Sequence, residues 1–164
     1  MKKMVLLLLF VCAGFSCDDE IYSNIPNTEV NLLLDLDFKD RNLVANQAYE
    51  VIIGPTPERP AHALDRFGYG GILVINGQGV EVINLFAYDL SCPVEAERNV
   101  RVAPNNTNTR DSDVPVALTA TCPKCGAVYN IYNGLGNPQS GTKFYLRSYR
   151  VMKESGGRQY RVIN

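Results

Sequence analysis

Residues 71–90, GILVINGQGVEVINLFAYDL, decide the fold class of this chain. Two apolar runs, 71–76 and 80–90, flank the turn-forming sequence Asn-Gly-Gln-Gly at 76–79. Asn and Gly tolerate the positive φ angles that tight hairpin turns require, and short apolar runs bounded by such residues are typical of strands. The stretch therefore predicts an antiparallel β-hairpin.

Short strand-like segments continue on both sides of this hairpin at a spacing of roughly ten residues. They are residues 30–38, 48–53, 99–103, 114–120, 127–133, 143–152 and 158–163. Residues 36–49 contain at most one turn of helix, because no apolar stripe with a 3.6-residue period continues there. We therefore predict an all-β protein, an antiparallel sandwich or small barrel, with a single domain over residues 29–164.

The composition excludes several functions. The chain has 164 residues, a net charge of -1 and one histidine, His62. A balanced charge provides no basic surface, so we expect no nucleic-acid partner. A single histidine excludes a site with two imidazole ligands, and no nucleophile elbow accompanies it. We therefore expect that the protein is not an enzyme.

The N-terminus has the pattern of an exported lipoprotein. Two lysines precede an apolar run over residues 4–15, which is typical of a signal peptide and short for a membrane span. The run ends at Gly-Phe-Ser-Cys17, which resembles a bacterial lipobox. This predicts a signal peptide over 1–16, then a lipidated Cys17 and a polar tether over 17–28. The alternative is a soluble secreted protein that is cleaved nearby.

An acidic run follows at residues 18–20, and it resembles the export signal of Bacteroidetes-type surface lipoproteins. We therefore expect a protein anchored to membrane lipid in the bacterial cell envelope, at the outer membrane and exposed at the surface. The sequence identifies no protein partner.

Three cysteines remain in the mature domain under this interpretation: Cys92, Cys122 and Cys125. An odd number of cysteines cannot all pair within the chain. Cys92 and Cys122 each follow a predicted strand and precede a proline, so two similar loops are expected at one end of a sheet. Thiolates on neighbouring loops form a candidate site for a soft metal.

The two loops, YDLSCPVE and CPKCGAVYNIYNG, resemble those of the Rieske iron–sulfur domain, and GNPQSGTKFYLRSYRV resembles its last loop and strands. The resemblance covers roughly residues 30–152 and is closest to Bacteroidetes Rieske-like lipoproteins that lack the cluster histidines. It implies a Rieske-like antiparallel β-sandwich, with a small cluster-binding subdomain at roughly residues 89–134. The function that it implies is electron transfer through a [2Fe–2S] cluster held by two cysteines and two histidines.

The chain departs from this pattern at both histidine positions. Val94 stands two residues after the first loop cysteine, and Cys125 stands three residues after Cys122. Valine cannot bind a metal, and the only histidine lies outside both loops. A normal Rieske cluster with two imidazole ligands is therefore not expected.

Four interpretations of the three cysteines remain open. The first is a site without a cofactor, with a disulfide between Cys122 and Cys125 or between Cys92 and Cys122. The second is a zinc or mononuclear iron site, with His62, Glu95, Asp89 or water as the fourth ligand. The third is an altered [2Fe–2S] cluster on the three thiolates. The fourth is a thiol redox switch. The first would make the protein a non-redox binding or structural module of the envelope.

Overall fold

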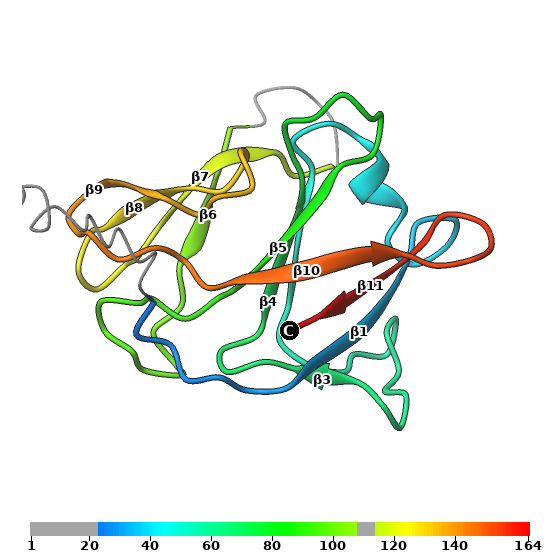
Figure 1. Ribbon diagram of the computed structural model, residues 1–164, viewed down its shortest axis with the longest axis horizontal. Helices are drawn as coiled ribbons and strands as arrows, with labels where there is room; N and C mark the ends of the chain where they lie inside the picture. The colour runs from blue at the N-terminus through cyan, green and yellow to red at the C-terminus, as the bar shows by residue number, and fades with distance from the viewer. Residues whose placement is uncertain (1–22, 108–113) are drawn as a thin grey trace, which may run out of the picture.

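A computed structural model of the chain describes residues 23–107 and 114–164. Over these residues the regular structure consists of strands and one short 3-10 helix, so the prediction of an all-β protein is confirmed (Figure 1). The elements are β1 (Val30–Asp35), η1 (Arg41–Val44), β2 (Tyr49–Ile52), β3 (Arg66–Phe67), β4 (Ile72–Asn76), β5 (Leu85–Asp89), β6 (Ala103–Asn106), β7 (Ala117–Thr121), β8 (Val128–Asn130), β9 (Pro138–Ser140), β10 (Ser148–Lys153) and β11 (Gln159–Ile163).

The strands form two antiparallel sheets. The larger sheet has seven strands in the order β2-β4-β5-β10-β11-β1-β3, and the smaller has four in the order β6-β7-β8-β9. Figure 1 shows the smaller sheet on the left, beside β4 and β5 of the larger one. The smaller sheet spans residues 103–140, whereas a subdomain over roughly 89–134 was predicted from the sequence.

The predicted central hairpin is present, but its second strand is shorter than expected. β4 pairs with β5 from Ile72↔Asp89 to Asn76↔Leu85. The prediction that the second strand begins at residue 80 is wrong, because residues 77–84 form a loop in which the side chain of Val80 is fully exposed. Asparagine side chains close this loop: the backbone N–H of Asn84 donates to Oδ1 of Asn76 at 2.8 Å.

The β4–β5 hairpin separates two hydrophobic cores. In β4, Leu73 and Ile75 face the core shared with the smaller sheet. Ile72 and Val74 face the core enclosed by the larger sheet. All four side chains are completely buried, which contributes about 1.5–3 kcal/mol each. Because successive strand residues point to opposite faces, burial on both faces explains why this strand is apolar throughout.

Other boundaries differ from the sequence prediction. The predicted strand at 99–103 is displaced, because β6 begins only at Ala103 and residues 93–102 form a connection. Strands β3 and β9 were not predicted; they have two and three residues, too few to show a periodic pattern. The turn of helix expected within 36–49 is present as η1.

The described domain begins before residue 29. Ile25 is buried, and its carbonyl accepts a hydrogen bond from Nη1 of Arg147 at 2.9 Å. The last residues assigned to the tether therefore pack against the domain. The signal peptide, Cys17 and its acidic run lie outside the described residues. Over the part of the chain that the structure describes, no helix has the length and hydrophobicity to cross a bilayer.

Candidate metal centre formed by three cysteines

Two strands bring the cysteine loops together. β5 ends at Asp89, three residues before Cys92, and β7 ends at Thr121, directly before Cys122. Both cysteines are completely buried in the core between the β4–β5 hairpin and the smaller sheet. Cys125, on the same loop as Cys122, is partly exposed. The site thus lies where the two sheets meet, with one thiol near the surface.

The buried carboxylate of Asp89 fixes the start of the first loop. It accepts backbone N–H groups from Tyr69 at 2.8 Å, Gly70 at 3.1 Å and Ser91 at 2.7 Å, and the hydroxyl of Tyr149 at 2.6 Å. Charge-assisted hydrogen bonds of this kind are stronger than those between neutral groups. Asp89 therefore ties the end of β5 to the loop before β4 and to β10.

The three thiols converge on one point. Their Sγ atoms all lie within 4.8 Å of one another, and Sγ of Cys92 is 3.6 Å from Sγ of Cys125. Tetrahedral zinc with Zn–S bonds of about 2.3 Å places two sulfurs about 3.8 Å apart. The spacing therefore matches ligation of a single ion. All three are free thiols in the structure, so both disulfides considered above remain predictions.

The backbone provides hydrogen bonds to the sulfurs. Burial raises the pKa of the Cys92 thiol to about 11, although N–H groups of the loop favour its thiolate. Burial also raises the pKa of Cys122, but the N–H groups of Cys125 and Lys124 and the thiols of Cys92 and Cys125 together outweigh it, so the pKa of Cys122 lies below its ordinary value. Amides that point at a sulfur stabilise the deprotonated form that ligates metals.

The three side chains predicted as possible fourth ligands lie in different surroundings. His62 is exposed on the connection between β2 and β3 and is not part of the three-cysteine group. The carboxylate of Asp89 accepts hydrogen bonds from the four donors described above. Glu95 lies in the first cysteine loop, and its carboxylate is 2.6 Å from Nζ of Lys124 on the second loop. The carboxylate of Glu95 thus links the two cysteine loops through Lys124, but it does not belong to the group of ligand atoms within 4.8 Å of one another.

The ligand set of a normal Rieske cluster does not fit these residues. Val94 packs against the hydrophobic core, and Cys125 carries a thiol at the position where the Rieske resemblance led to the expectation of an imidazole. In a [2Fe–2S] cluster of this kind, two imidazoles hold one iron. No imidazole is present at this site.

Two neighbours of the site were missed by the sequence reasoning. The hydroxyl of Tyr129 lies 3.7 Å from Sγ of Cys92, and burial followed by this contact raises the pKa of Tyr129. Lys124 pairs with Glu95 and also with Glu97 at 2.8 Å, and these hydrogen bonds raise its pKa. The position of Lys124 between two cysteines was a visible signal, whereas Tyr129 looked like an ordinary strand residue.

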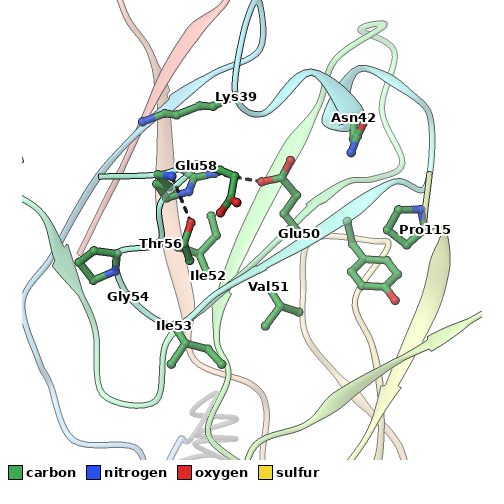
Figure 2. A pocket seen from close by; sticks show the side chains of 13 residues that line it. Lys39, Asn42, Glu50, Val51, Ile52, Ile53, Gly54, Thr56, Glu58 and Pro115 are labelled. Carbon is green, nitrogen blue, oxygen red and sulfur yellow. Dashed lines mark hydrogen bonds and ion pairs between the residues drawn. The ribbon is translucent and has the colours of Figure 1, made fainter. Parts of the chain in front are cut away.

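A separate cavity of about 670 Å³ lies along β2 and contains none of the cysteines. Figure 2 shows Lys39, Glu50 and Thr56 around it. Arg59 pairs with Asp40 and, at 3.0 Å, with Glu50. Burial raises the pKa of Glu50 to about 7, while the charge of Lys39 opposes this rise. Of the four charged side chains that line this cavity, Arg59 and Glu50 form an ion pair with each other.

When the chain is compared with protein-family models, with curated proteins and with solved structures, no match is found. The function must therefore be inferred from the three-cysteine site itself.

Proposed function

We propose that the three cysteines bind one soft divalent metal ion, with zinc as the first candidate, and that the metal stabilises the junction of the two sheets. The observation that carries this proposal is the convergence of Cys92, Cys122 and Cys125, whose sulfurs lie within 4.8 Å. In an altered [2Fe–2S] cluster the three thiolates would be divided between two irons, so their sulfurs would not need to meet at one point. A zinc ion on thiolates contributes to folding by joining segments that are distant in sequence.

The protein that carries this site is, in our proposal, a lipid-anchored, non-enzymatic protein of the bacterial cell envelope. The N-terminal pattern ending at Cys17 supports the anchor. Two Cys-Pro loops that follow strands and meet beside a small four-stranded sheet support a Rieske-like domain. The replacement of both histidines supports the exchange of an electron-carrying cluster for a single structural ion.

Metal analysis of the full chain tests this proposal. The chain is purified in detergent without oxygen, its metals are measured, and an absorption spectrum is recorded. We expect about one zinc per chain, no visible absorption, and loss of the zinc when all three cysteines are replaced by serine. The intact mass of the same sample reports whether Cys17 carries lipid.

Two results would overturn the proposal. About two irons and two labile sulfides per chain, with thiolate-to-iron absorption bands, would establish an altered cluster and an electron carrier. A chain without metal, in which two of the three thiols resist labelling until a reductant is added, would establish a disulfide.

A further inference from the structure

The two cysteine loops have the same backbone conformation. In the first loop, the N–H of Ala96 donates to the carbonyl of Cys92 at 2.9 Å; in the second, the N–H of Gly126 donates to the carbonyl of Cys122 at 3.0 Å. The fifth residue of each loop has a positive φ, 52° for Ala96 and 73° for Gly126. The five-residue loops at 92–96 and 122–126 therefore correspond residue by residue.

The hydrogen bonds to sulfur follow the same correspondence. In the first loop, the third and fourth residues direct their N–H groups at the sulfur of Cys92. In the second loop, the third and fourth residues, Lys124 and Cys125, direct theirs at the sulfur of Cys122. Each loop thus presents its first residue as a ligand with two N–H groups of its own loop directed at the sulfur.

The fourth residue of the second loop, Cys125, completes the group of three sulfurs. The fourth residue of the first loop is Glu95, which also ends in a group that can bind a metal. Two equivalent loops that each offer their first and fourth residues make a site of four ligands, the number that structural zinc requires.

The carboxylate of Glu95 is already held toward the second loop. One of its oxygens is 2.6 Å from Nζ of Lys124, and only 16% of its side chain is exposed. Glu97 contacts the same Nζ at 2.8 Å, but 58% of its side chain is exposed and it lies outside the five-residue loop. A carboxylate has two oxygens, so one can bind a metal while the other accepts from Lys124.

We infer that Glu95 is the fourth ligand: its carboxylate, which pairs with Lys124 and lies outside the group of sulfurs within 4.8 Å, turns from its loop toward the three sulfurs to bind the ion. This inference rests on the proposed metal site. A set of three thiolates and one carboxylate suits zinc, whereas copper(I) is selected by sulfur alone. The positive charge of Lys124 offsets part of the negative charge of four anionic ligands.

Metal titration of three variants tests the role of Glu95. Zn²⁺ affinity is measured on the metal-free full chain by competition with a coloured chelator, and Co²⁺ is added as a spectroscopic probe. We expect Glu95→Gln to weaken zinc binding about tenfold or more, which is the scale of losing a supporting group at a metal site. Glu97→Gln is the matched control, because it removes a contact with the same lysine, and we expect a change of less than about twofold.

The third variant, Glu95→Cys, gives the inference a positive readout. A fourth thiolate in place of the carboxylate should preserve tight binding and increase the sulfur-to-cobalt absorption by about one third, from three thiolates to four. Equal affinity in Glu95→Gln and Glu97→Gln, or no added absorption in Glu95→Cys, would overturn the role of Glu95 and leave the three-thiol site standing. A native chain that binds neither ion would overturn both.

Discussion

Replacing Asp89 with asparagine tests how the fold supports the site. Asparagine has the same shape but only one acceptor oxygen, so its amide N–H₂ group would face the N–H of Tyr69 where a carboxylate oxygen now accepts. The hydroxyl of Tyr149 can rotate to accept from the new amide, but a backbone N–H cannot. One buried donor is left unsatisfied, and the remaining hydrogen bonds lose their charge. We expect a loss of about 2–4 kcal/mol in the free energy of unfolding.

Tyr149→Phe is the matched control, because it removes one donor to the same carboxylate and leaves the three backbone contacts in place. We expect a smaller loss of about 1–2 kcal/mol. Urea denaturation followed by circular dichroism measures both variants on the metal-free chain. With a slope of about 2 kcal/mol per M, Asp89→Asn should lower the midpoint by about 1–2 M. An asparagine variant no less stable than Tyr149→Phe would refute the assignment of Asp89 as the anchor of the first loop.

Two further predictions concern charge and backbone strain. The pKa of Glu50 rises from its ordinary 4.5 to about 7 on folding, so its ionisation costs stability between these pH values. The stability of Glu50→Gln relative to the native chain should therefore rise by about 1–2 kcal/mol as the pH rises from 4 to about 8. This figure allows for the Arg59 contact and for solvent screening. Parallel curves of unfolding free energy against pH for the two chains would contradict this prediction. Gly126→Ala should lose about 1 kcal/mol of folding stability, because alanine is strained at the positive φ of this position. No clash adds to this loss, since nothing lies within 4 Å of the added carbon. Ala96→Gly at the equivalent position should gain about 0.5 kcal/mol, and effects of the same sign in thermal melts would contradict the equivalence of the loops.

The sequence predicted strands well where turn residues bound an apolar run. The β4–β5 hairpin was identified from its Asn-Gly-Gln-Gly turn, but Val80 and Val82 were assigned to the second strand because they begin the apolar run that follows the turn. In the structure both valines are exposed, because they lie in the loop of residues 77–84. A hydrogen bond between Asn84 and the side chain of Asn76 closes this loop. Side-chain capping of this kind depends on a partner across the loop, which a local pattern does not contain.

The site was predicted in part. The position of two Cys-Pro loops after strands led to the expectation of three neighbouring thiols, and their sulfurs do lie together. The sequence offered no way to choose among fourth ligands. The equivalence of the loops is apparent only from the backbone hydrogen bonds to the carbonyls of Cys92 and Cys122. In the sequence, alanine at position 96 and glycine at position 126 give no sign that the two positions correspond.

X-ray absorption at the zinc edge of the purified full chain tests the central claim most directly. We expect three sulfurs at about 2.3 Å and one oxygen at about 2.0–2.2 Å around a single zinc ion. A shell of nitrogen and oxygen ligands with no sulfur would mean that any zinc present is bound elsewhere, and it would contradict the claim that Cys92, Cys122 and Cys125 form a metal centre.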